Sequence, residues 1–227
     1  MAELDGRVIV VTGGFGTLGS AVVTMAAAAG AKIACIDQGN DHGGPGLRLG
    51  GIDLADDAAC RQALTQVVDA LGPLYGLVNV AGGFEMASLA EGGLDPWDRM
   101  YRTNLRTVLS ASYAALPLLS AQKSGRIVNI GAAAAAKGMA GMGAYAASKS
   151  GVARLTESLA EETRGSGITV NAILPVIIDT PANRAAMPQA DSSKWTPPTD
   201  IAEVILFLLS DRARAVTGAL INVSGPN

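Results

Sequence analysis

Tyr145 and Lys149 form the pair of side chains best suited to proton transfer in this chain, four residues apart in Tyr145-Ala146-Ala147-Ser148-Lys149. In a helix this spacing places the phenol and the ammonium on one face. A free phenol has a pKa of about 10, too high for acid–base work near neutrality, and a neighbouring cation lowers that pKa. We therefore expect Tyr145 to exchange a proton with a substrate, with Lys149 making its phenol more acidic.

A glycine-rich turn near the N-terminus predicts a dinucleotide site. The apolar run at residues 8–11 leads into Gly-Gly-Phe-Gly-Thr-Leu-Gly at residues 13–19, which contains G-x-G-x-x-G between an expected strand and an expected helix. Such glycines permit a tight turn and close approach of a pyrophosphate, which the helix N-terminus attracts. Asp37 follows at the end of the second expected strand, where a carboxylate accepts ribose hydroxyls and repels a 2′-phosphate. These features favour NAD(H) over NADP(H) as the cofactor.

The elements that must position these residues follow an alternating pattern. Short β-branched runs alternate with longer Ala- and Leu-rich stretches, which is typical of βαβ units. We expect an α/β fold, a single Rossmann-type doubly wound parallel sheet with helices on both faces. The strands are expected at residues 7–12, 32–37, 76–80, 126–130, 169–174 and 219–223, and the helices at 18–29, 56–71, 95–119, 144–164 and 200–209.

No composition shift divides the chain, so we expect one dinucleotide-binding and catalytic domain over residues 1–227. The glycine-rich stretch at residues 39–51 is expected to be a loop around a possible short strand. Residues 181–198 hold several prolines, and a long segment this late in an α/β domain favours a substrate lid.

Composition excludes several classes of function. The chain has 17 basic and 20 acidic residues, with the basic ones scattered, and 4% aromatic residues, which argues against a nucleic-acid partner. It has one histidine, His42, and two cysteines, Cys35 and Cys60, so we expect no metal site. No apolar run approaches the roughly 18 residues of a membrane span. We expect a cytoplasmic protein with no membrane partner.

With these motifs the chain resembles the short-chain dehydrogenase/reductase family. The resemblance rests on residues 12–19, on Ile-Asp-Leu at 52–54, on Asn-Val-Ala-Gly at 79–82, on Asn104, and on Tyr145 with Lys149. It implies an NAD-linked oxidoreductase that exchanges hydride with a small-molecule substrate. It also implies a homodimer or homotetramer that pairs through the helices expected at 95–119 and 144–164.

The resemblance assigns roles to individual residues. Tyr145, Lys149 and Asn104 would be catalytic, with Asn104 holding a water in the proton relay. Residues that would contact the cofactor are Gly13, Phe15, Gly16, Leu18, Gly19, Asp37, Asp53, Leu54, Asn79, Ala81, Gly82, Tyr145, Lys149, Pro175, Ile178 and Thr180.

One position departs from the family pattern. Ala132 stands where the family has its catalytic serine, and residues 131–136 contain no hydroxyl at all. Loss of a preorganised donor to a developing oxyanion typically costs about 3–4 kcal/mol. A conjugated, nitrogen-bearing acceptor needs that donor less than a simple ketone does. Residues 13–19, 80–83 and 174–197 are similar to the dihydropteridine reductases, which also lack the serine and pass hydride from NADH to quinonoid dihydropterin.

Two alternatives remain open from the sequence. One is an ordinary NAD-dependent alcohol or ketone dehydrogenase in which another group replaces the serine hydroxyl. The other is a catalytically silent NAD-binding sensor or partner subunit. Ala132 favours the silent protein, whereas the intact Tyr145, Lys149 and Asn104 argue against it.

Overall fold

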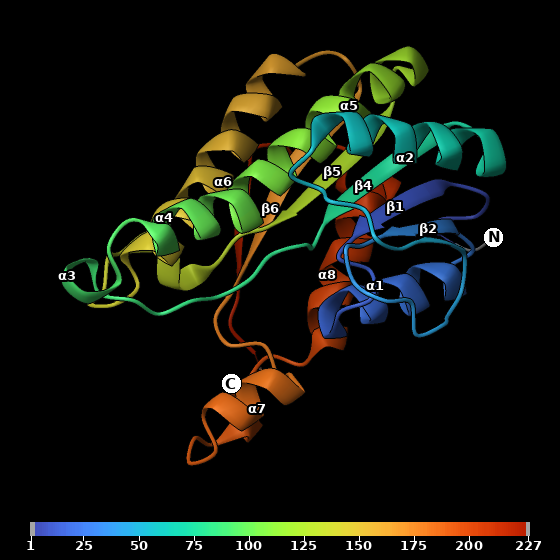
Figure 1. Cartoon of the computed structure of the whole chain (residues 1–227). Helices are drawn as coiled ribbons and strands as arrows, with labels where there is room; N and C mark the ends of the chain where they lie inside the picture. The colour runs from blue at the N-terminus through green and yellow to red at the C-terminus, as the bar shows by residue number, and fades with distance from the viewer. Residues whose placement is uncertain (1–2, 226–227) are drawn as a thin grey trace.

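Residues 3–225 are described by a computed structural model, and within them seven strands form one parallel sheet in the order β3-β2-β1-β4-β5-β6-β7 (Figure 1). This confirms the expected doubly wound α/β fold. The chain moves outward from β1 to β2 and β3, then returns to the other side of β1 for β4 to β7. The strands are β1 (Val8–Thr12), β2 (Lys32–Ile36), β3 (Leu47–Leu49), β4 (Leu74–Asn79), β5 (Gly125–Ile130), β6 (Ile168–Pro175) and β7 (Leu220–Val223).

Helices cover both faces of the sheet. Helices α2, α5 and α6 lie on one face, and α1 and α8 on the other. The bounds of the α-helices are α1 (Thr17–Ala28), α2 (Asp57–Leu71), α3 (Leu89–Gly92), α4 (Asp95–Met100), α5 (Thr107–Gln122), α6 (Gly143–Glu162), α7 (Pro181–Ala186) and α8 (Pro198–Leu209). Short 3₁₀ turns lie at Ala133–Ala136, Ser192–Lys194 and Asp211–Ala213. Within residues 3–225 no helix has both the length and the apolar character needed to cross a bilayer.

Alternate residues of each strand build two separate cores, because successive side chains point to opposite faces. Val8 and Val10 of β1 pack with buried side chains of α2, α5 and α6. Ile9 and Val11 pack on the other face, with α1 and α8. Strands covered on both faces read as continuous apolar runs, which explains why β1 is buried along its whole length.

The long helix expected at residues 95–119 is in fact interrupted. A π-helical turn at Tyr101–Arg106 separates α4 from α5, and α5 continues to Gln122. The turn contains Asn104, whose side chain bonds both backbone groups of Gly83. A single π-helical turn inside a helix re-aims side chains at functional sites, and apolar periodicity gives no signal for it.

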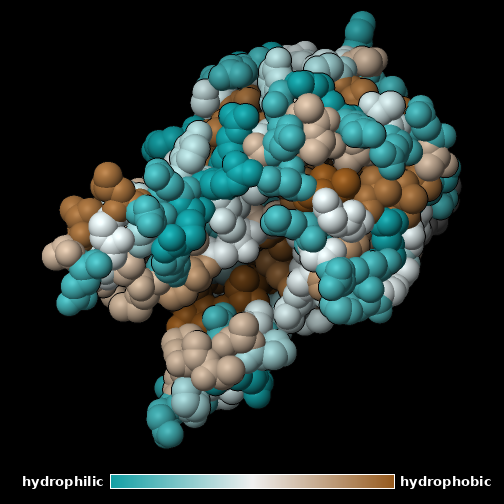
Figure 2. Space-filling view, in the orientation of Figure 1, coloured by the Kyte–Doolittle hydropathy of each residue, from teal (hydrophilic) through white to brown (hydrophobic). Residues whose placement is uncertain are grey.

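The segment expected to form a lid leaves and re-enters the body of the protein at one place. The backbone N–H of Thr196 donates to the Ile177 carbonyl at 2.8 Å, and that of Asp179 donates to the Thr196 carbonyl at 2.9 Å. Trp195 and Thr196 are buried at this base. Between the two anchoring points the chain forms α7, which projects from the body of the molecule (Figure 1). Figure 2 shows a hollow between this projection and the rest of the surface, with hydrophobic residues on its floor.

Candidate active site

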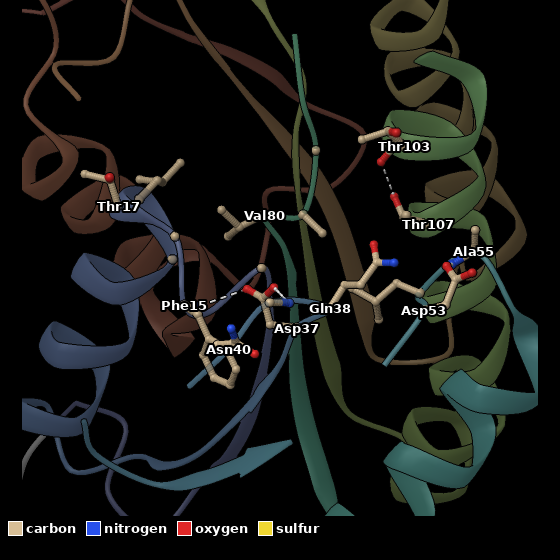
Figure 3. Close-up of a pocket in the computed structure, with 18 of the residues that line it drawn as sticks. Phe15, Thr17, Asp37, Gln38, Asn40, Asp53, Ala55, Val80, Thr103 and Thr107 are labelled. Carbon is tan, nitrogen blue, oxygen red and sulfur yellow. Dashed lines mark hydrogen bonds between the residues drawn. The ribbon is translucent and has the colours of Figure 1, made fainter. Parts of the chain in front are cut away.

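A cavity of about 630 Å³ lies at the carboxyl ends of the strands, where the strand order reverses between β2, β1 and β4. Open α/β sheets bind their ligands at this switch point. The lining comes from the loop after β1, the ends of β2 and β4, and residues 53–55 beyond β3 (Figure 3). The π-helical turn that contains Asn104 and the start of α5 complete this side of the cavity. Thr180 and Ala182, which follow β6, also line it.

Backbone crowding fixes the glycine turn. Gly13 has a φ of +66°, and a Cβ built on it would lie 2.7 Å from the Ala81 backbone nitrogen. A Cβ on Gly19 would lie 2.0 Å from the Gly13 carbonyl oxygen. Helix α1 begins directly after Gly16, with no side chain capping its first N–H groups. The turn therefore presents free backbone donors to the cavity, which suits a pyrophosphate.

Asp37 is held in place at the end of β2. One carboxylate oxygen accepts from the Phe15 backbone N–H at 3.0 Å, and the other accepts from the Gly39 N–H at 2.8 Å (Figure 3). The carboxylate lines the cavity beside the glycine turn. A carboxylate has about four lone-pair sites, so two bonds leave capacity for a diol.

Tyr145 and Lys149 lie in the first two turns of α6, as the sequence predicts, and their electrostatics are dominated by burial. Burial lowers the pKa of Lys149 to about 8, while its ammonium donates to the Ile130 carbonyl at 2.8 Å. Burial also raises the pKa of the Tyr145 phenol. This is opposite to the direction expected from a neighbouring cation, because the shift arises from desolvation, which penalises the phenolate.

Asn104 ties the cavity to α6. Its amide oxygen accepts from the Gly83 N–H at 2.8 Å, and its amide nitrogen donates to the Gly83 carbonyl and to the Ser148 hydroxyl, both at 3.0 Å. The Ser148 hydroxyl in turn donates to the Tyr145 carbonyl at 2.8 Å. The π-helical turn thus holds the first turn of α6 through a side-chain network.

Gly82 joins the cavity to these side chains. It lines the cavity, and a Cβ built on it would lie 2.8 Å from the Asn104 amide oxygen and 3.2 Å from the Lys149 ammonium. Asn104 and Lys149 therefore lie next to the cavity end formed by the loop after β4, and Tyr145 is linked to Asn104 through Ser148. Phe84 packs edge-on against Tyr145, with ring centroids 4.9 Å apart.

Ala132 is buried and extended at the entrance to the 3₁₀ turn that precedes α6. Residues 131–136 read Gly-Ala-Ala-Ala-Ala-Ala, so this turn has no side-chain hydrogen-bond donor for a substrate oxygen. Ser150 is one hydroxyl near it, and its oxygen donates to the Ala135 carbonyl at 2.8 Å.

Most of the residues expected to contact a cofactor share the cavity, and some do not. Asn79 is buried under its floor, donating to the Asn129 amide oxygen at 2.8 Å and to the Ser112 hydroxyl at 3.3 Å. Pro175 ends β6, and the Ile178 carbonyl accepts from the Asn183 side chain at 2.8 Å. Tyr145 and Lys149 are also absent from the lining. Those in the lining are Gly13, Phe15, Gly16, Leu18, Gly19, Asp37, Asp53, Leu54, Ala81, Gly82 and Thr180.

Sequence reasoning missed several residues of the lining. Arg102, Thr103 and Thr107 reach the cavity from the π-helical turn and the start of α5. Thr103 and Thr107 are four residues apart, a spacing that places them on one helix face. His42, from the glycine-rich loop, lines the cavity as well.

Together the doubly wound sheet, the glycine turn at its switch point and the half-buried Tyr145 with the buried Lys149 define a dinucleotide-dependent oxidoreductase. The family model described as short chain dehydrogenase matches residues 7–191. The chain is 33% identical to 2-(S)-hydroxypropyl-CoM dehydrogenase 3 of Xanthobacter autotrophicus, covering 98% of this chain and 97% of that protein. It therefore belongs to the short-chain dehydrogenase/reductase family, whose members use a nicotinamide cofactor and act on small molecules.

Two further comparisons agree with this membership. Acetoacetyl-CoA reductase of Shinella zoogloeoides is 33% identical, over 96% of this chain and 97% of its own length. The solved structure of a short-chain type dehydrogenase/reductase from Mycobacterium ulcerans superimposes with a TM-score of 0.91 at 27% identity. That match covers 99% of this chain and 93% of the other.

Proposed function

We propose that this protein is an NADH-dependent reductase of a conjugated acceptor, with a quinonoid dihydropteridine as the best candidate substrate. The observation that carries the proposal is Ala132, a buried methyl group beside an otherwise complete set of Tyr145, Lys149 and Asn104. A missing oxyanion donor costs a simple ketone about 3–4 kcal/mol. A conjugated acceptor spreads the developing charge over several atoms and loses less.

The preference for NADH is supported by the surroundings of Asp37. Its carboxylate is fixed by the Phe15 and Gly39 N–H groups, so it cannot easily turn away from a 2′-phosphate. Arg102, a permanently cationic residue of the lining, is paired with Asp53. A 2′-phosphate would meet a fixed negative charge at Asp37, whereas the two free hydroxyls of NADH would donate to it.

In the proposed reaction NADH supplies the hydride. Tyr145 donates the proton from its phenol, which its raised pKa keeps protonated at neutral pH. Lys149 is cationic below about pH 8 and stabilises the phenolate that remains. Asn104 holds the loop after β4 and, through Ser148, the turn that contains Tyr145. Catalysis is then mainly positioning of the acceptor between the phenol and the nicotinamide.

Two other functions have specific support. The names of the relatives, a hydroxypropyl-CoM dehydrogenase and an acetoacetyl-CoA reductase, favour an ordinary alcohol or ketone dehydrogenase. Ala132 favours a silent NAD-binding sensor or partner subunit. The hydrogen-bond network of Asn104, Ser148 and Tyr145 argues against a silent protein. So does the buried Lys149, because burying its ammonium destabilises the folded protein and a protein without catalysis would gain nothing from it.

Turnover assays separate these functions. The oxidation of NADH and of NADPH is measured with quinonoid dihydropterin, a quinone and a simple ketone, alongside the binding of NADH. We expect NADH to be preferred and the conjugated acceptors to turn over at least 10²-fold faster than the ketone, the factor that one missing donor costs. Faster turnover of the ketone supports the ordinary dehydrogenase. NADH binding without turnover of any acceptor supports the silent protein.

Assembly through α5 and α6 is also proposed, as a homodimer or homotetramer. Tyr113 on α5 is 64% exposed in the single chain, and aromatic side chains such as tyrosine are enriched in protein interfaces. Light scattering of the purified protein tests this, and a monomeric mass at micromolar concentration would contradict it.

A further inference from the structure

Three large apolar side chains are exposed on the loop after β4 and on the segment before α6. Phe84 and Met86, on the loop, are 59% and 65% exposed, and Met139, on the segment, is 59% exposed. We call these three residues the apolar flank. Exposed apolar side chains that gather in one place mark a binding surface, whereas scattered ones need no explanation. The proton-transfer steps described above use none of the three.

Phe84 places the apolar flank beside the reacting phenol. Its ring packs edge-on against the Tyr145 ring, with centroids 4.9 Å apart and planes inclined at 76°. The remainder of the Phe84 ring is open to solvent, since more than half of the residue is exposed. An acceptor that takes a proton from Tyr145 therefore lies within reach of the open part of Phe84.

Contacts between the loop and the segment bring the two methionines to the same place. The Ala87 N–H donates to the Gly141 carbonyl at 2.8 Å, and a Cβ built on Gly141 would lie 3.3 Å from the Met86 Cε. Met139 belongs to the same turn, because its carbonyl accepts from the Met142 N–H at 3.0 Å. Figure 2 shows hydrophobic residues at the end of the molecule that α3 and α4 form, which Figure 1 places beside the start of α6.

The charges around the apolar flank are mostly negative. Residues 83–99 contain one cation, Arg99, and four carboxylates, at Glu85, Glu91, Asp95 and Asp98. Arg99 donates from Nε and Nη2 to the two carboxylate oxygens of Glu85, so its charge is already paired. The segment before α6 adds one exposed cation, Lys137. Such surroundings repel an anionic group on a substrate and accept an uncharged apolar one.

We propose that the apolar flank holds a hydrophobic substituent of the acceptor, and that Phe84 is the specificity-determining residue for that substituent. The inference rests on the function proposed above, and it narrows the substrate class to uncharged conjugated acceptors that carry a hydrophobic group. The conjugated part lies at Tyr145, and the substituent lies on Phe84 and extends toward the two methionines. Because methionine side chains are unbranched and adaptable, the protein selects for an apolar substituent more than for its exact shape.

The test compares kcat/KM for the NADH-dependent reduction of three quinonoid dihydropterins, generated in the assay. They carry at carbon 6 a methyl group, a pentyl group, or a butyl chain that ends in a carboxylate. We expect the pentyl compound to exceed the methyl compound by about tenfold, less than full burial of four methylenes would give, because the flank stays partly open. The carboxylate compound should fall at least about tenfold below the pentyl compound.

Variants of Phe84 separate recognition of the substituent from a merely structural role. In Phe84→Ser the pentyl-to-methyl ratio of kcat/KM should drop from about tenfold to about threefold or less, and Phe84→Leu should retain most of the ratio. A variant that only displaced Tyr145 would slow both acceptors alike and leave the ratio unchanged. The matched control is Leu94→Ser, at a leucine that is 72% exposed and lies outside the apolar flank, where the ratio should stay at its wild-type value.

Several results would overturn the inference while the proposed function stands. The wild-type protein could reduce all three acceptors with similar kcat/KM values, or favour the compound with the carboxylate. The ratio could also survive Phe84→Ser, or fall equally in Leu94→Ser. If the wild-type protein oxidises NADH with none of the three pterins and with no quinone, the proposed function fails together with the inference.

Discussion

Replacing Lys149 with methionine should stabilise the protein while abolishing its activity. Burial lowers the pKa of the Lys149 ammonium from its ordinary 10.5 to about 8. Each unit corresponds to about 1.4 kcal/mol, so the charged form costs the folded state about 3 kcal/mol at neutral pH. Methionine fills similar space without the charge but forfeits the bond from the ammonium to the Ile130 carbonyl, which is worth about 2 kcal/mol because its donor is charged. The net expected gain in the free energy of unfolding is about 1 kcal/mol, or roughly 2–4 °C in the melting temperature.

The stability gain of Lys149→Met should depend on pH, which distinguishes the loss of a buried charge from other effects of the substitution. Below about pH 8 the ammonium is charged in both the folded and the unfolded protein, so the burial cost of Lys149 is fully present. Between about pH 8 and 10.5 the folded protein binds fewer protons than the unfolded one, so wild-type stability rises relative to the variant. The advantage of Lys149→Met should therefore be greatest at pH 6–8 and be lost before pH 10.5, because the burial cost declines while the loss of the bond to Ile130 remains.

Urea unfolding of the coenzyme-free protein at several pH values measures this difference. The control is Lys137→Met, at an exposed lysine, where a change within about 0.5 kcal/mol at every pH is expected. A variant at position 149 that is less stable than the wild-type protein at pH 7 would refute the reasoning. So would a gain in stability that does not change with pH.

Three further predictions concern single positions. Ala132→Ser should raise turnover of simple ketones more than that of conjugated acceptors, by about tenfold or more in the ratio of kcat/KM values, and an equal effect on both would contradict the account of the missing hydroxyl. Asp37→Ala should bring the Kd for NADPH within about tenfold of that for NADH, as measured by fluorescence titration; an unchanged preference would show that Asp37 does not select the coenzyme. Asp211→Asn should destabilise the protein by about 1 kcal/mol at pH 7, because Asp211 pairs with Arg7 and with the buried Arg126. The Arg7 guanidinium holds the pKa of the Asp211 carboxyl below its usual range, so this difference should shrink as the pH falls through that pKa; thermal unfolding that shows the same deficit at pH 3 and pH 7 would contradict it.

Most of the overall fold could be predicted from the sequence, because its strands and helices are determined by patterns of neighbouring residues. Five buried strands and the five long helices follow from apolar runs and helical periodicity. The glycine turn after β1 marks the edge of the sheet at which the cavity lies. The edge strand β3 has only three residues, Leu47–Leu49, in a glycine-rich stretch, so its pairing with β2 depends on the tertiary fold. The π-helical turn depends on a bond between Asn104 and Gly83, twenty-one residues apart, which periodicity cannot show.

The site was only partly predictable for the same physical reason. The spacing of Tyr145 and Lys149 places them on one helix, but it does not reveal how deeply the helix is buried, and burial decides both pKa shifts. Asn79 illustrates the other limit. It ends β4 at the level of the cavity, yet its side chain is turned to Asn129 on the neighbouring strand, a pairing that needs the strand order.

The central claim is that the Tyr145 phenol gives the proton that accompanies hydride transfer, and the Tyr145→Phe variant tests it most directly. The rate of NADH oxidation with quinonoid dihydropterin and the Kd for NADH are measured together in the variant and the wild-type protein. The account predicts that turnover falls by at least 10²-fold while the Kd changes less than threefold. A variant that binds NADH normally and retains most of its turnover would show that the proton comes from elsewhere.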